Sequence, residues 1–132
     1  MHSIDIVAAL VAALGSFVVG GLWYGSLFQK PWMRHSGVTP ERGEAQNKAL
    51  VFGLAYLLNY IAAAGLSMLM GDHSGWGVGL HTGLLTGVFF VAPALGVIYL
   101  FEARSFVHWL LNAGYQVVTF GLMGTIVGAW PW

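Results

Sequence analysis

Apolar residues fill four long stretches of the chain, and polar residues gather in the connections between them. The stretches cover about residues 4–28, 48–70, 77–101 and 105–130. Each matches or exceeds the roughly 20 apolar residues that an α-helix needs to cross a bilayer. Lipid offers the backbone no hydrogen-bond partners, so each stretch is predicted to be a helix. The short connections predict one all-α domain, residues 1–132, folded as an antiparallel four-helix transmembrane bundle.

Composition excludes most soluble classes. The chain has 132 residues, of which 58% are hydrophobic and 8% are charged, whereas soluble domains carry about 25% charged residues. So few charges cannot coat a soluble enzyme, and they cannot form the basic face of a nucleic-acid-binding protein. The chain has no cysteine, which excludes disulfides, thiolate-held metals and a cysteine nucleophile. The lipid bilayer is therefore the first expected partner.

Basic residues mark one side of the membrane. All five lie in or beside the first and third connections, at Lys30, Arg34, Arg42, Lys48 and Arg104. The positive-inside rule places these connections in the cytoplasm and both termini outside.

The first connection, residues 29–47, contains a helix-start signal. Thr39 is an N-cap candidate, Pro40 suits the first helical position, and Glu41 places an acid in the first turn. The second helix is therefore expected to start near Pro40 and to protrude from the membrane. Pro31 and Gly37 predict an irregular chain before it.

Glycines four residues apart form ladders on three of the predicted helices. Such spacing puts small residues on one helix face, where they allow close packing in lipid. The preferred interpretation is packing within the bundle, and the alternative is a homo-oligomer interface through the third helix. The residues are Gly79, Gly83 and Gly87, with Gly21/Gly25 and Gly124/Gly128.

A polar stripe is the most informative chemical feature. Four side chains of the fourth helix follow the i, i+3, i+4, i+7 spacing of one face, and two residues of the second helix lie at a similar depth. Buried polar groups in lipid need partners, so we expect either a hydrogen-bond clamp between the second and fourth helices or a small polar cavity for a substrate or proton path. The six residues are Asn112, Tyr115, Gln116 and Thr119, with Asn59 and Tyr56.

Signs of catalysis are missing from the sequence. The spans contain no central charged residue, and no nucleophile–base–acid set or His-x-x-x-His metal pair occurs. We therefore expect no enzyme, no catalytic residues, no metal and no cofactor. Aromatic residues near the span ends, Trp23, Tyr24 and Tyr99 among them, are interpreted as interfacial anchors. Pro93 is expected to bend the third helix by removing its bond to Phe89.

Two sequence signatures resemble a known family. They read GLWYGSLF at residues 21–28, followed by WM at 32–33, and NAGYQ at 112–116, followed by MGTIVGAW at 123–130. Together they resemble the small bacterial four-helix membrane proteins catalogued as domain of unknown function 1761. The resemblance covers nearly the whole chain and implies four spans and a bacterial inner membrane, with no assigned biochemistry and no catalytic residues to transfer.

The favoured hypothesis is a structural or accessory membrane protein that packs against itself or a larger complex. The alternative is an oligomeric permeation or small-ligand-binding protein that uses the midplane polar cluster.

Overall fold

Nine helical segments make up the computed structural model, which describes residues 5–131. In chain order they are α1 (Ile6–Leu22), η1 (Trp23–Leu27), α2 (Gln29–Ser36), α3 (Pro40–Ala45), α4 (Lys48–Met70), α5 (Trp76–Thr86), η2 (Gly87–Val91), α6 (Ala92–Phe101) and α7 (Phe106–Ala129). The segments η1 and η2 are π-helical turns that continue α1 and join α5 to α6. No strand occurs between residues 5 and 131. The predicted all-α fold class is confirmed.

Four helices are long and apolar enough to cross a membrane: Ile6–Leu27, Lys48–Met70, Trp76–Phe101 and Phe106–Ala129. The protein is therefore a multi-pass membrane protein. Residue 4, the predicted start of the first span, lies outside the described residues.

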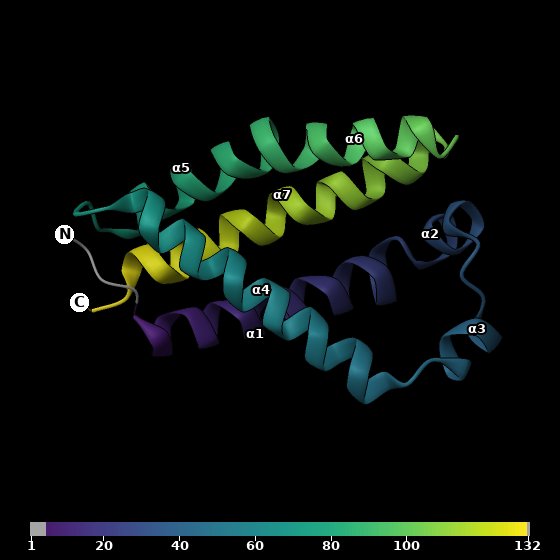
Figure 1. Ribbon diagram of the computed structural model, residues 1–132, viewed down its shortest axis with the longest axis horizontal. Coiled ribbons are helices and arrows are strands. Elements are labelled where there is room, and N and C mark those ends of the chain that lie inside the picture. The colour runs from purple at the N-terminus through teal and green to yellow at the C-terminus, as the bar shows by residue number, and fades with distance from the viewer. Residues whose placement is uncertain (1–4, 132) are drawn as a thin grey trace.

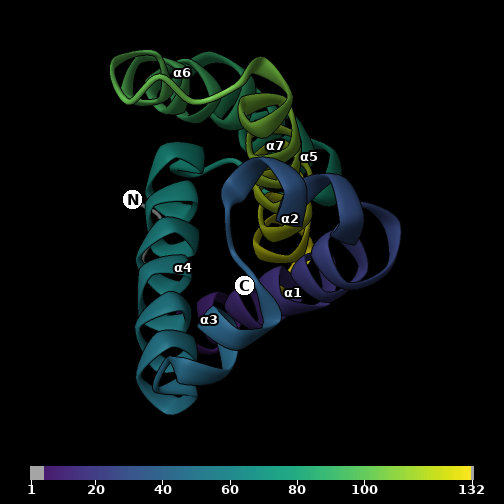
Figure 2. The same cartoon turned by 90° about the vertical axis from the view of Figure 1, so that its right-hand side faces the viewer.

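Helix α7 is the centre of the bundle (Figures 1 and 2), and it packs against α1, α4, α5 and α6. Helices α1 and α5 begin, and α4 and α7 end, at the same end of the molecule (Figure 1). We call this the terminal end, and we call the opposite end, which carries α2, α3 and the turn from α6 to α7, the basic end.

The closest helix pair is α5 against α7. A Cβ added at Gly83 would run into the carbonyl oxygen of Phe120, and one added at Gly128 would lie 2.9 Å from Cα of Gly79. The two backbones therefore touch, which glycine alone permits and which gives van der Waals contact in lipid.

The buried apolar core lies toward the terminal end. It joins alanines of α1 to larger side chains of α4 and α7, namely Ala9, Ala12, Ala63, Leu66, Met70, Met123 and Val127. Small residues on α1 let α4 and α7 approach it closely. Toward the basic end α4 diverges from α7 (Figure 1), and Leu54, Leu57 and Leu58 are exposed.

The first connection is more helical than its sequence suggests. Residues 29–36 form α2 with Pro31 in its first turn, so the expectation of an irregular chain here is wrong. Proline is tolerated there because the first N–H groups of a helix have no internal acceptor. Gly37 ends α2 with a left-handed backbone, φ +77°.

A helix does start at Pro40, where the Thr39 hydroxyl accepts a hydrogen bond from the Arg42 N–H at 3.2 Å. It stops at Ala45, and Asn47 caps α4 separately by accepting from the Leu50 N–H. The second membrane helix therefore starts at Lys48 and does not extend back to Pro40.

Candidate functional site

A three-helix polar cluster is centred on Asn112, about 10 Å along α7 from its first residue. Its side-chain oxygen accepts a hydrogen bond from the Tyr24 hydroxyl at 2.5 Å. Its side-chain nitrogen donates to the Tyr99 hydroxyl at 2.7 Å. One amide therefore links η1, α6 and α7. Because the low-polarity surroundings offer no competing partners, the link holds the basic half of the bundle together.

Neighbouring aromatic residues complete the cluster on the α1 side. The Tyr24 ring lies 4.9 Å from Trp32 of α2 and 5.1 Å from Tyr115 of α7. The Tyr115 hydroxyl donates to the carbonyl oxygen of Ser16 at 3.3 Å. The cluster therefore packs both α1 and α2 against α7.

Toward the basic end, polar contacts reach the surface of the bundle. The Ser105 hydroxyl caps α7 by accepting from the His108 N–H and lies 3.0 Å from Nδ1 of His35. The buried His108 ring lies 4.9 Å from the Tyr99 ring. These contacts join α2 to the turn between α6 and α7.

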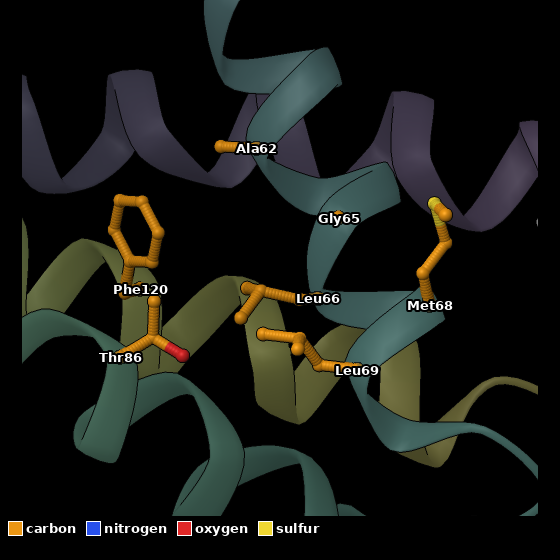
Figure 3. A pocket seen from close by; sticks show the side chains of 7 residues that line it. All are labelled: Ala62, Gly65, Leu66, Met68, Leu69, Thr86 and Phe120. Carbon is orange, nitrogen blue, oxygen red and sulfur yellow. The ribbon is translucent and has the colours of Figure 1, made fainter. Parts of the chain in front are cut away.

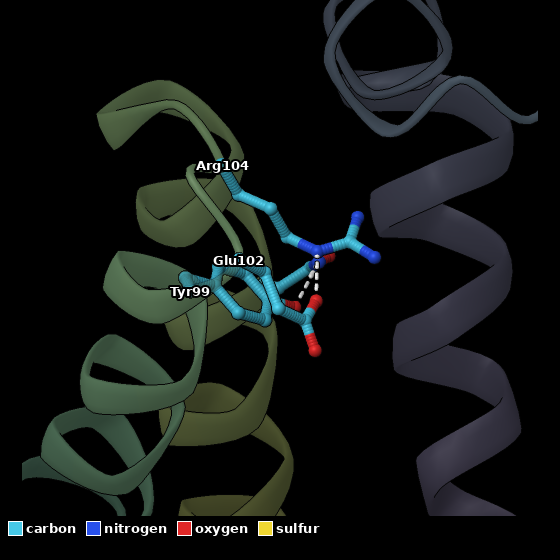
Figure 4. A network of polar contacts seen from close by, with 4 residues as sticks. Tyr99, Glu102 and Arg104 are labelled. Carbon is cyan, nitrogen blue, oxygen red and sulfur yellow. Dashed lines mark hydrogen bonds and ion pairs between the residues drawn. The ribbon is translucent and has the colours of Figure 1, made fainter.

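An ion pair covers this end of the cluster (Figure 4). Nε of Arg104 donates to Glu102 at 2.6 Å, and the guanidinium carbon lies 5.6 Å from the centre of the Tyr99 ring. The hydrogen bond to Glu102 raises the pKa of Arg104. Arg104 therefore stays positively charged at the membrane surface.

The structure brings together part of the predicted polar cluster. Asn112 and Tyr115 lie in it, and Thr119 is buried one turn after Tyr115, with Gln116 half-buried on the same helix. Asn59 is not brought to them, since its amide donates to Ala55 of its own helix at 3.0 Å.

Tyr56 also lies apart from Asn112, and its hydroxyl donates to the carbonyl oxygen of Leu10 on α1 at 2.9 Å. The interhelical clamp therefore joins η1 and α6 to α7, and the expected clamp from the second helix to the fourth is corrected. The equal depth predicted for Asn59 and Gln116 did not bring Asn59 to the α7 cluster, because α4 diverges from α7 in the basic half (Figure 1).

The predicted glycines fall into two groups. Gly79, Gly83 and Gly87 face α7 and are met there by backbone or side-chain atoms, as are Gly124 and Gly128 from α5. A third-helix interface to a second copy would need the same face, which the chain itself covers. Gly21 and Gly25 have no atom within 4 Å of an added Cβ.

Sequence reasoning missed Tyr24 and Tyr99 as members of the cluster. Both lie near the span ends, where aromatic residues commonly anchor membrane proteins at the interface. Interfacial anchoring was therefore enough to explain their positions. A usable signal existed: a phenol near a span end carries a hydroxyl that needs a partner when the ring is buried, and Asn112 supplies both a donor and an acceptor.

The cluster offers little reactive chemistry. Both side-chain groups of Asn112 are already hydrogen-bonded within the chain. Among residues 5–131, no group of three metal-ligating side chains occurs. Toward the terminal end the core turns to alanine, leucine, methionine and valine. The arrangement can hold helices together. The buried polar side chains of Ser16, Ser67 and Thr119 also lie among the packed residues of α1, α4 and α7.

A separate apolar hollow of about 510 Å³ separates α4 from the α5–α7 pair. Figure 3 shows Leu66 and Leu69 of α4 pointing toward Phe120 and Thr86 across it. The Thr86 hydroxyl donates a hydrogen bond to the carbonyl oxygen of Thr82 in its own helix. The lining of the hollow therefore needs almost no polar partner from an occupant. We call it the α4 hollow; its lining is Ala62, Gly65, Leu66, Met68, Leu69, Thr86 and Phe120.

Comparison with known protein families identifies a matching family. The model of the family described as "Protein of unknown function (DUF1761)" matches residues 7–128, nearly the whole chain. No curated protein and no solved structure matches.

Proposed function

We propose that this chain, which belongs to the DUF1761 family of proteins of unknown function, is a non-enzymatic accessory membrane protein that associates with a second copy of itself. We place it in a bacterial cytoplasmic membrane, with α2 and α3 in the cytoplasm and both termini outside. The positions of the five basic residues support this orientation. The side-chain amide of Asn112, which is hydrogen-bonded through both its oxygen and its nitrogen, supports a role without chemistry.

The observation that carries self-association is the α4 hollow. It interrupts the lipid-facing side of the bundle, and small residues of α4, Ala62 and Gly65, line it. A Cβ added at Gly65 would meet no atom within 4 Å, so this glycine is not needed for packing within the chain. Small residues on an open helix face allow another helix to approach closely. A second copy using the same face would form a two-fold symmetric interface.

Subunit counting in nanodiscs tests the proposal, with Gly65→Leu compared against Gly53→Leu. Both glycines lie in α4, and an added Cβ would meet no atom within 4 Å at either position, so neither change creates a clash at Cβ. Single-molecule photobleaching should show two copies for the parent. Gly65→Leu should shift the count to one, whereas Gly53→Leu should keep it at two. A parent that is strictly monomeric, or two variants that behave alike, would overturn the proposal.

The alternative, permeation through the polar cluster, has less support. It needs an open polar path along the bundle, whereas the polar side chains beyond the cluster, Ser16, Ser67 and Thr119, are fully buried among the apolar residues of the core. Flux lost in Asn112→Leu, in an otherwise folded protein, would favour permeation.

A further inference from the structure

An apolar groove of about 460 Å³ lies along α7, beside η2 and α6. Small residues Ala92, Ala113 and Gly114 line it together with the rings of Trp23 and Trp109. Gly114 is required at its position, because an added Cβ would lie 2.9 Å from the Trp23 ring. We call this hollow the tryptophan groove.

Both indole rings of the tryptophan groove are held in place. Nε1 of Trp23 donates to the carbonyl oxygen of Leu111 at 2.9 Å, and Nε1 of Trp109 donates to that of Ala92 at 2.9 Å. Each ring has therefore satisfied its one polar group inside the protein. What remains toward the groove is apolar ring surface in a fixed orientation, which suits a hydrocarbon chain.

The tryptophan groove continues toward the basic end. Trp109 also lines a second hollow, of about 290 Å³, together with Leu100, Arg104 and Phe106. Along α7 the combined lining runs from Ser105 to Val118, about 20 Å at 1.5 Å per residue. This length exceeds the ~15 Å hydrocarbon depth of one leaflet. The lining is therefore long enough to contact an acyl chain from the membrane surface to the midplane.

The guanidinium of Arg104, paired with Glu102, lies where the lining reaches the membrane surface. The Arg104 side chain is 40% exposed, and Glu102 engages its Nε. Figure 4 shows the two terminal nitrogens beyond the Glu102 carboxylate, on the side that faces the N-terminal helices. Helix α7 begins beside it. Ser105 caps the His108 N–H, and the N–H groups of Phe106 and Val107 before it have no acceptor within the helix and attract anions. The mouth of the lining is therefore complementary to a phosphate.

We propose that the tryptophan groove holds one acyl chain of an anionic phospholipid whose phosphate lies at Arg104 and the first turn of α7. The occupant is a glycerophospholipid of the leaflet that contains the basic end. The fixed indoles select for an apolar chain, and Arg104 selects for negative charge. This inference is independent of self-association, because the tryptophan groove shares no lining residue with the α4 hollow.

Native mass spectrometry of the full chain tests the site, using micelles with equal amounts of phosphatidylglycerol and phosphatidylcholine. The parent should retain one lipid and favour phosphatidylglycerol. Arg104→Gln should reduce that preference about fivefold, the effect of one basic residue near an anionic membrane surface. Arg34→Gln is the matched control, because Arg34 is exposed on α2 and outside the lining, and it should leave the preference unchanged.

A second pair of variants tests the chain site. Val118→Trp places a large ring in the tryptophan groove and should abolish retention of both lipids. Val18→Trp makes the same exchange on α1 and should retain the lipid. Val118 and Val18 are 44% and 61% exposed, so both changes spare the core. The proposal is overturned if the parent retains no lipid or shows no preference, or if the members of either pair behave alike.

Discussion

Replacing Gly83 by alanine tests the close packing of α5 on α7 with a single methyl group. The added Cβ would run into the carbonyl oxygen of Phe120 and would lie 3.1 Å from Cα of Gly121. Both obstacles are backbone atoms of α7, so no side-chain rotation can relieve them. The helices must separate, and the contacts at Gly79 and Gly87 on the same face must loosen with them.

The magnitude follows from a matched control, Gly53→Ala. Gly53 lies inside α4 and its added Cβ meets nothing within 4 Å, so this change gains only the helix propensity of alanine, about 1 kcal/mol. Gly83→Ala gains the same propensity and incurs an overpacking cost of about 3 kcal/mol, at the upper end of the usual range because the clash is with backbone. We expect Gly83→Ala to be about 2 kcal/mol less stable than the parent and ~3 kcal/mol less stable than Gly53→Ala.

Equilibrium unfolding in mixed micelles, followed by tryptophan fluorescence and circular dichroism, measures this difference. The propensity gain is common to both variants, so the gap between their unfolding free energies isolates the packing cost. If Gly83→Ala is as stable as Gly53→Ala, the two backbones do not touch and the account of the α5–α7 interface is refuted.

Three further predictions concern the polar cluster, the α7 cap and the orientation. Asn112→Leu should lower the unfolding free energy by about 1–2 kcal/mol, because Tyr24 loses its acceptor; an unchanged value in mixed micelles would contradict the link. Ser105→Ala removes the α7 cap and should cost about 1 kcal/mol in the same assay, and no loss would show the cap to be dispensable. In this cysteine-free chain, Ser74→Cys should react with a membrane-impermeant maleimide in intact cells and Gln46→Cys only after permeabilisation; the opposite pattern would reverse the orientation.

Hydropathy located the spans well, because a bilayer forces length and composition on any helix that crosses it. The second span was predicted as residues 48–70, and α4 is Lys48–Met70. The third was predicted as residues 77–101, and the structure has Trp76–Phe101. Hydropathy does not report backbone geometry, however, so the π-helical turns η1 and η2 were not foreseen. In η2 the Ala92 N–H bonds to Gly87, five residues back, just before Pro93.

The candidate site was predicted only in part, because the depth of a residue says nothing of which helix it faces. Gln116 and Asn59 were placed at similar depth, with Asn112 on the same helix face as Gln116. Asn112 nevertheless bonds across helices, and Asn59 bonds to its own helix. Their different partners follow from how α4 diverges from α7, which depends on packing at the terminal end. The role of Tyr24 and Tyr99 in the cluster was not predicted. Aromatic residues are common at membrane interfaces, and interfacial anchoring already explained the positions of both tyrosines.

Cross-linking in native membranes tests self-association through the α4 hollow most directly. The chain has no cysteine, so an introduced thiol is the sole site for a short bis-maleimide. Leu69 points into the α4 hollow (Figure 3) and is 67% exposed, whereas Val18 of α1 is 61% exposed and lies outside it. The account predicts a covalent dimer for Leu69→Cys and little for Val18→Cys. Absence of the Leu69→Cys dimer, or equal dimer from both positions, would contradict it.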